Sequence, residues 1–320
     1  MNTISSPGQQ SMRVIAKDPL ADGVVALRLA DAAGGSVPMW EPGSHIDLVL
    51  DTSMTRQYSL CGDPSDTSTL TVAVLREGSG RGGSIHVHDK LETGDVIEIG
   101  GPRNHFALVE AESYVFVAGG IGITPLLPML RAAQARGANW RLLYGGRTRG
   151  SMAFADELAE EFGENVSLRP QDEYGILDLA SALDAAAPGT AVYCCGPEPL
   201  LQAIEAVCRE REHLNLHIER FSPKQLEEGV VDDAFDVELA RSGRTIGVGA
   251  DESIIDALQR GGVTVDFSCR EGTCGTCEVA VLGGKPDHRD SILTEEEQEA
   301  GDAMMICVSR SRTPKLVIDL

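Results

Sequence analysis

Residues 267–279 read FSCREGTCGTCEV, and three cysteines in this stretch, Cys269, Cys274 and Cys277, follow a Cys-x4-Cys-x2-Cys pattern. A fourth, Cys307, comes after 29 intervening residues. A 2Fe-2S cluster needs four thiolates, two for each iron, and a tight loop with one distant cysteine is a spacing typical of such clusters. Zinc sites use similar residues, but usually as two Cys-x2-Cys pairs, and only one such pair is present here. The pattern therefore predicts a 2Fe-2S cluster on these four cysteines, with zinc or no metal as the alternatives.

The surroundings of the loop predict the fold of this region. Gly272 and Gly275 lie inside the loop, where a residue without a side chain lets backbone N–H groups approach the sulfurs. Such N–H groups tune the reduction potential of a cluster. Short strands return from about residue 235, with one helix between them at 253–262. We therefore predict that residues 235–320 form a plant-type ferredoxin domain with a β-grasp fold, preceded by a polar linker at 223–234.

The first part of the chain, residues 12–106, reads as short strands separated by Gly, Pro, Asp and Ser. Many short strands at close spacing favour a closed or nearly closed antiparallel barrel. The one helix candidate here is SIHVHDKL at 84–91. The strand candidates are MRVIAKD (12–18), VVALRLAD (24–31), HIDLVLD (45–51), RQYSLCG (56–62), TLTVAVLRE (69–77) and DVIEIGG (95–101).

The middle part, residues 107–222, alternates buried strands with helices. YVFVAGG at 114–120 reads as a strand, and TPLLPMLRAAQARG at 124–137 reads as the helix that follows it. Such alternation predicts a doubly wound parallel sheet with crossover helices on both faces. Further strands are expected at 140–146, 166–170, 190–196 and 216–221, and further helices at 152–163, 178–185 and 197–214.

The barrel region carries a candidate flavin site. In RQYSL (56–60), Arg56 is a fixed cation, Tyr58 a flat ring and Ser59 a small hydroxyl, which together suit an isoalloxazine ring. GRGGS (80–84) opens the predicted helix, and a glycine-rich backbone with one Arg and one Ser at a helix start can hold a phosphate. The alternatives are ordinary surface residues for the first motif and a flexible hairpin loop for the second.

The middle region carries a candidate nicotinamide nucleotide site. Gly119, Gly120 and Gly122 form a turn between a strand and a helix, where bare backbone can approach a pyrophosphate. The motif is not GxGxxG, so the ordinary dinucleotide fingerprint does not apply. Thr124 and Pro125 suit the N-cap and N1 positions, and capping alone is the alternative role for them.

A second turn repeats this logic at YCCGPEP (193–199). Gly196 turns the chain and Pro197 is expected to begin the next helix, while Cys195 ends a parallel strand, where ligands bind in such sheets. A buried core cysteine is the alternative. Arg147 and Arg149 follow another strand, at a position suited to a ribose or a 2′-phosphate, to the diphosphate of NADH, or to solvent alone.

The charge of the chain excludes some partners. Its net charge is −22, with 27 Lys and Arg against 49 Asp and Glu, which argues against nucleic acid or an anionic membrane as partner. From residue 225 onward there are 20 acidic and 9 basic side chains, which suggests an acidic face for a basic partner, or only solubility. No apolar run reaches the 18 residues needed to span a membrane, and the N-terminus lacks a secretory signal pattern. We expect a cytoplasmic protein whose eight cysteines form no disulfides.

Six motifs together resemble the phthalate dioxygenase reductase family, which includes reductases of the vanillate demethylase type. They are RQYSL, GRGGS, GGIGITP, CCGPEP, ERF and CREGTCGTC, in an order that covers nearly the whole chain from about residue 12 to 320. The resemblance implies a flavin barrel, then an NAD domain, then a C-terminal ferredoxin domain. It also implies FMN in preference to FAD, NADH as electron donor, a monomer, and a separate terminal oxygenase as partner.

The resemblance further implies roles for particular residues. Thr124 would touch the flavin from the NAD domain, and Phe221 would lie near the ring. Gln57 lies inside the flavin motif and is not expected to matter. The other implied contacts are Arg56, Tyr58, Ser59, Ala73, Val74 and Leu75 around the flavin, Arg81, Gly82, Gly83 and Ser84 on its phosphate, and Gly120, Gly122, Cys195, Gly196 and Pro197 beside the nicotinamide and its diphosphate.

These cofactors imply a division of electrons. NADH delivers two electrons as a hydride, a cluster accepts one, and a flavin can exchange either number. We therefore expect an NADH-dependent reductase that passes electrons through FMN and the cluster to a Rieske-type non-haem iron oxygenase, with no catalytic acid or base. The alternatives are a reductase for a haem monooxygenase and a redox sensor with the same domains.

Overall fold

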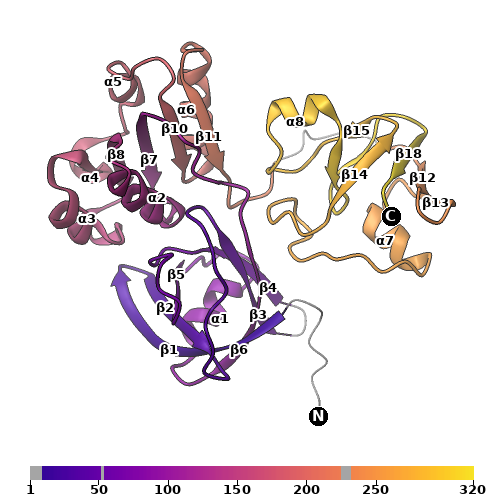
Figure 1. Cartoon of the computed structure of the whole chain (residues 1–320), viewed down its shortest axis with the longest axis horizontal. Helices are drawn as coiled ribbons and strands as arrows, with labels where there is room; N and C mark the ends of the chain where they lie inside the picture. Colours follow the sequence, from indigo (N-terminus) through magenta and orange to yellow (C-terminus); the bar gives the residue numbers. More distant parts are fainter. Residues whose placement is uncertain (1–8, 52–53, 225–231) are drawn as a thin grey trace. The chain divides into compact units, whose positions relative to one another are not determined.

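The computed structural model describes residues 9–51, 54–224 and 232–320 (Figure 1). The chain forms two compact units, Met1–Glu219 and Arg220–Leu320. The first contains an antiparallel barrel and a parallel sheet, and the second contains a mixed sheet. These three sheets confirm the predicted fold class. Most of the predicted linker at 223–234 lies outside the described residues, and the predicted domain bounds stay predictions.

Six antiparallel strands and one short helix form the barrel. The strands run in the order β4-β3-β6-β1-β2-β5, and an isolated bridge between Leu60 and Val72 joins the two edge strands. Side chains alternate along each strand, so that one face packs into a core that includes Met12, Leu27 and Ile46. The elements are β1 (Gln9–Ala21), β2 (Val24–Asp31), β3 (His45–Asp51), β4 (Met54–Ser59), β5 (Leu70–Leu75), α1 (Gly83–Asp89) and β6 (Val96–Arg103).

The parallel sheet has the strand order β11-β10-β7-β8-β9. Alternate residues of its buried strands face opposite layers, because Phe116 packs in one hydrophobic cluster and Val115 and Val117 in another. Two buried layers are what a doubly wound sheet requires. The strands are β7 (Ser113–Gly119), β8 (Asn139–Gly146), β9 (Val166–Pro170), β10 (Ala191–Cys195) and β11 (Asn215–Glu219), and the helices are α2 (Ile123–Ala135), α3 (Ala155–Phe162), α4 (Gln171–Tyr174), α5 (Leu179–Leu183) and α6 (Glu198–Arg209).

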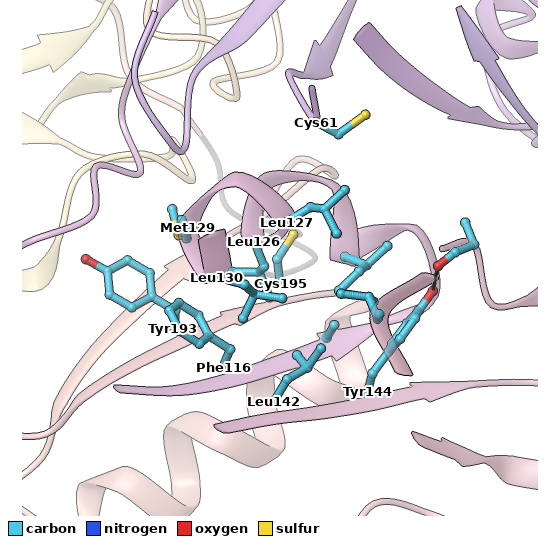
Figure 2. Packing of buried hydrophobic residues seen from close by; sticks show 14 of the residues in the cluster. Cys61, Phe116, Leu126, Leu127, Met129, Leu130, Leu142, Tyr144, Tyr193 and Cys195 are labelled. Atoms are coloured by element: carbon cyan, nitrogen blue, oxygen red, sulfur yellow. Dashed lines mark hydrogen bonds between the residues drawn. The ribbon is translucent and has the colours of Figure 1, made fainter. Parts of the chain in front are cut away.

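Helix α2 fills the layer between this sheet and the barrel. Its Leu126, Met129 and Leu130 belong to the same buried cluster as Phe116 and the barrel residue Cys61 (Figure 2). The barrel residues Val24 and Ala73 join the cluster as well. Barrel and parallel sheet therefore share one core, and the sites they carry are held in a common framework.

Two helix starts differ from the prediction. Helix α2 begins at Ile123 with Gly122 as N-cap, so Thr124 and Pro125 lie inside the first turn and are not N-cap and N1. Helix α6 begins at Glu198, and Pro197 is its N-cap. The cap of helix α2 is therefore a residue of the glycine turn, and the cap of helix α6 is the extended Pro197 that follows Gly196. Differences of one or two residues at a helix end are ordinary.

The C-terminal unit is a mixed sheet with the order β13-β12-β18-β14-β16, in which only β12 and β18 are parallel. Helix α7 packs on it through Ile254, Ile255 and Leu258, which belong to its core cluster. Its elements are β12 (Phe235–Leu239), β13 (Arg244–Val248), α7 (Ile254–Arg260), β14 (Glu278–Gly283), β15 (Pro286–Asp287), α8 (Glu295–Ala300), β16 (Ala303–Met305), β17 (Arg310–Ser311) and β18 (Lys315–Ile318).

No helix within the described residues combines the length and apolar character needed to cross a membrane.

Candidate functional site

The four cysteines of the C-terminal unit come together although Cys307 is remote in sequence. All four are buried, between 1% and 7% exposed. Cys269 receives hydrogen bonds from the thiols of Cys274 and Cys307, which hold its pKa far below the ordinary value. The side chains of Cys277 and Cys307 are also in hydrogen-bond contact, and the pKa of Cys277 is lowered. Within the described part of the chain, no group of three or more His, Cys, Asp or Glu side chains has an arrangement that could hold a single metal ion.

Backbone amides of the cysteine loop point at sulfur. The N–H groups of Glu271 and Thr273 donate to the Sγ of Cys269 over 3.3 and 3.5 Å. Gly272 has a φ of 71°, and a Cβ added there would lie 2.7 Å from the Val308 side chain. Four clustered thiols wrapped by donating amides suit a 2Fe-2S cluster, because the amides stabilise negative charge on sulfur.

The two predicted flavin motifs meet in the barrel. The Arg56 guanidinium donates to the carbonyl of Arg81 over 2.8 Å, and a Cβ added at Gly83 would lie 2.4 Å from the Arg56 side chain. Gly82, with a φ of 81°, caps helix α1. The Ser84 hydroxyl accepts the Glu77 amide over 2.9 Å. The Arg56 side chain and the Arg81 backbone therefore lie at a bare, glycine-lined helix start, which fits a phosphate group.

The remaining flavin motif residues divide between two faces of strand β4. Burial raises the pKa of Tyr58 to about 12, so its hydroxyl stays protonated. Gln57 faces the other way and donates to Asp47 over 2.7 Å, and Asp47 also accepts Arg103 over 2.7 Å. Gln57 thus has a structural role, because it ties the flavin strand to the neighbouring strands.

The backbone segment predicted to line the flavin is strand β5. Val74 faces the barrel core and Ala73 faces the cluster shared with helix α2. The His88 ring contacts the Val74 carbonyl at 2.9 Å, which ties helix α1 to this strand. Leu75 packs beside the shared cluster. Strand β5 therefore contacts the barrel core, helix α1 and the cluster that is shared with helix α2.

The two glycine turns of the parallel sheet lie against each other. A Cβ added at Gly122 would come within 2.2 Å of the Cys195 carbonyl oxygen, and one at Gly119 within 2.7 Å of Pro197. The Tyr144 hydroxyl donates to the Gly120 carbonyl over 3.1 Å and so braces the first turn. Bare backbone at adjacent strand ends can accept a diphosphate closely, which suits the predicted nucleotide site.

Sequence reasoning missed the residue that links the two sites. Glu219 ends strand β11 opposite Cys195, and the Ser59 side chain of the barrel hydrogen-bonds to its carboxylate. Its Oε2 atom is shielded from solvent and has no hydrogen-bond partner among the residues that the structure describes. Desolvation raises the pKa of Glu219 to about 8, against the smaller lowering by Ser59. The segment ERF contains this residue, but only tertiary contact reveals its environment.

Burial also controls the chemistry of the neighbouring cysteine. Desolvation, followed by the charge of Glu219, raises the pKa of Cys195 well above its ordinary value. Cys195 is therefore a protonated thiol at neutral pH and not a nucleophile. Its place at the strand end is compatible with both the binding role and the core role predicted for it.

Four predicted residues are less closely grouped. Thr124 is buried and its hydroxyl donates to the Ile121 carbonyl over 3.0 Å, inside the first glycine turn. Arg147 is exposed, and its carbonyl accepts the Asp172 amide over 3.2 Å, whereas Arg149 pairs with Asp156. Phe221 belongs to the second unit and is 44% exposed, so its role at the flavin ring stays a prediction.

Comparisons with known proteins find similar domains in two parts of the chain and similar proteins over its whole length. The model for the oxidoreductase NAD-binding domain matches residues 116–206, and the model for the 2Fe-2S iron-sulfur cluster binding domain matches residues 237–312. The chain is 44% identical to phenoxybenzoate dioxygenase subunit beta of Ectopseudomonas oleovorans over 322 residues, which is all of both chains. It is 35% identical to phthalate dioxygenase reductase of Burkholderia cepacia over 325 residues, again all of both.

Solved structures extend this similarity to three dimensions. The structure of phthalate dioxygenase reductase matches 98% of each chain with a TM-score of 0.70 at 34% identity. A type IV self-sufficient cytochrome P450 monooxygenase matches with a TM-score of 0.91 at 42% identity, and this chain spans 43% of its length. Because its domains match both family models and its relatives match over its full length, the chain belongs to the phthalate dioxygenase reductase family, oxidoreductases that join an NAD-binding domain to a 2Fe-2S domain.

Proposed function

We propose that this chain is the NADH-dependent reductase component of a multicomponent oxygenase. Electrons would pass from NADH through FMN and a 2Fe-2S cluster to a separate terminal oxygenase of the Rieske type. The proposal includes a monomer in the cytoplasm. A flavin accepts a hydride and releases electrons singly, and this converts the two-electron chemistry of NADH to the one-electron chemistry of the cluster.

One observation carries the proposal, and it is the contact between Ser59 and Glu219. Ser59 belongs to the flavin motif of the barrel, and Glu219 ends the strand that pairs with Cys195 beside the glycine turns. A hydride donor and acceptor must lie in contact, so their binding sites must share a boundary. The contact between Ser59 and Glu219 supports the proposal that such a boundary lies here.

The barrel residues would hold FMN by its phosphate and its ring. Arg56 and Arg81 would neutralise the phosphate, since both lie at the bare start of helix α1. Two arginines at this position support FMN over FAD, because FMN ends in a monophosphate whose terminal charge they could balance. The residues proposed for the flavin are Arg56, Tyr58, Ser59, Ala73, Val74, Leu75, Arg81, Gly82, Gly83, Ser84, Thr124 and Phe221.

The parallel sheet would hold the nucleotide. Support for NADH over NADPH comes from two exposed carboxylates near Arg147. The backbone amide of Asp172 donates to the Arg147 carbonyl, so the side chains of Asp172 and Glu173 lie close to this residue. Negative charge at this place disfavours a 2′-phosphate. The residues proposed for the nucleotide are Gly120, Gly122, Arg147, Cys195, Gly196 and Pro197, and those for the cluster are Cys269, Cys274, Cys277 and Cys307.

One experiment tests the cofactor assignment. Mass spectrometry of the flavin released from the purified full chain, with iron and acid-labile sulfide assayed on the same sample, should give FMN, two irons and two sulfides per chain. The ratio of kcat/KM for NADH to that for NADPH, measured with ferricyanide and with cytochrome c, completes the test. Release of FAD, or zinc in place of iron, would contradict the assignment.

The nature of the terminal oxygenase has one specific rival. The similarity to the P450 monooxygenase chain at 42% identity supports a haem monooxygenase as second candidate. The relatives named as dioxygenase subunit and reductase support a non-haem partner, and they match over their full length. Capture of the native partner on the immobilised reductase, followed by optical and EPR spectra of the captured protein, distinguishes a Rieske centre from haem.

A further inference from the structure

Arg270, inside the cysteine loop, has a backbone conformation that its residue type disfavours. Its φ is 58°, in the left-handed region, where a residue with a side chain is strained. The other residues with positive φ described in the loop are Gly272 and Gly275, and a glycine carries no such strain. An arginine where glycine would be easier indicates that its side chain has a function.

The Arg270 side chain is anchored outside the loop. Its guanidinium donates to the Asp256 carboxylate over 2.8 Å and to the Gln259 side-chain oxygen over 3.1 Å, both on helix α7. It also lies over the Phe267 ring, 4.4 Å from the centroid. A single exposed ion pair would hold the Arg270 side chain only weakly. Two hydrogen bonds and a ring contact on the same planar guanidinium fix its position and its orientation.

The turn at Arg270 determines where the next amides point. Directly after it, the Glu271 and Thr273 N–H groups both donate to the Sγ of Cys269. Hydrogen bonds to cluster sulfurs stabilise the more negative, reduced state and so raise the reduction potential. If the turn relaxed toward a right-handed conformation, these two donors would be redirected.

We propose that Arg270 is a positioning residue for the iron-sulfur site. Its tether to helix α7 holds the left-handed turn, the turn aims the two amides at Cys269, and the amides set the potential of the cluster. The inference rests on the proposed assignment of the four cysteines to a 2Fe-2S cluster. It concerns the backbone conformation and not the charge of Arg270, which Asp256 already balances.

Two substitutions separate conformation from charge. Arg270→Ala removes the tether and keeps the strain of positive φ, so the turn should relax. Arg270→Gly removes the tether and the same charge, but glycine adopts positive φ freely, so the turn should persist. Arg241→Ala, which breaks an exposed ion pair with Asp319 in the same unit, is the matched control for a lost surface cation.

The full-length protein with its cofactors is used for each variant. Potentials are measured by spectroelectrochemistry with EPR detection of the reduced cluster, and iron release to a chelator is followed over time. For Arg270→Ala we expect the equilibrium constant for cluster reduction to fall at least tenfold, which is 59 mV for one electron, with faster iron release. Arg270→Gly and Arg241→Ala should stay within threefold of the wild type.

Other outcomes would overturn the inference. Equal shifts of the reduction potential in Arg270→Ala and Arg270→Gly would mean that the charge, and not the backbone conformation, sets the potential. No shift in either variant would mean that the contacts of Arg270 with helix α7 do not affect the potential. If Arg270→Ala assembles no cluster, Arg270→Gly must still assemble it at the wild-type potential. Wild-type protein without iron and labile sulfide would instead refute the proposed cluster, and with it the inference, whereas an intact wild-type cluster confines a failure to Arg270.

Discussion

Replacing Glu219 with Gln should make the first unit less sensitive to rising pH. The pKa of this buried carboxyl is raised from its ordinary 4.5 to about 8 by desolvation. Because its pKa in the folded protein is higher than in the unfolded chain, the folded state holds the proton more tightly. The contribution of the protonated Glu219 to the free energy of unfolding is therefore fully present below about pH 4.5 and is lost as pH rises toward 8.

The size of the effect follows from the two pKa values. Each pKa unit corresponds to about 1.4 kcal/mol, so the full difference between the protonation states is on the order of 5 kcal/mol. Between pH 5 and pH 8 the wild-type unit should lose roughly 3 to 4 kcal/mol from this group. Glutamine has nearly the same shape and cannot ionise, so the variant should lack this loss. Its amide can still bond to Ser59.

Urea unfolding followed by tryptophan fluorescence measures this in the full chain. The two tryptophans, Trp40 and Trp140, both lie in the unit that contains Glu219, so the signal reports on that unit alone. Wild type and Glu219→Gln are compared from pH 5 to pH 8 with saturating FMN. Glu212→Gln, at an exposed glutamate of the same unit, is the control and should parallel the wild type.

Parallel pH dependences for wild type and Glu219→Gln, within about 1 kcal/mol, would refute the reasoning. Such a result would mean that the carboxylate is ionised in the folded protein and that solvent or a bound group satisfies its Oε2 atom. Infrared difference spectra give an independent check, because a protonated carboxyl has a carbonyl band that Glu219→Gln must remove.

Three further predictions concern the separate sites. Cys274→Ser should abolish the iron-sulfur absorbance while NADH still reduces the flavin, and loss of flavin reduction in a folded variant would show that the two functions are not separable. Arg81→Ala should weaken FMN retention about 10- to 100-fold, the worth of a charge-assisted hydrogen bond, with little change in NADH affinity, as equilibrium dialysis and KM would show. Gly122→Ala should raise the KM for NADH and destabilise the unit by about 1–3 kcal/mol, because its methyl would lie 2.2 Å from the Cys195 carbonyl; an unchanged KM would count against the glycine turn as a nucleotide site.

The sequence alone determined features that depend on local pattern. The Cys-x4-Cys-x2-Cys spacing predicted a ferredoxin domain, and the family model for a 2Fe-2S domain covers residues 237–312. Short alternating strands predicted the barrel, and strand–helix alternation predicted the parallel sheet, because backbone periodicity records which side of an element is buried. Glycine turns were visible for the same reason, since only glycine tolerates such close approach.

The tertiary structure decided what depends on contact between distant segments. Ser59 and Glu219 are 160 positions apart, and nothing near Glu219 in sequence indicates that its carboxyl is desolvated. The hydrogen bond from Gln57 to Asp47 likewise joins residues whose contact the flavin motif does not indicate. The left-handed backbone of Arg270 and its tether to helix α7 exist only in the folded chain. Local pattern encodes which residues are buried, whereas solvation, partners and strain depend on neighbours that only folding brings together.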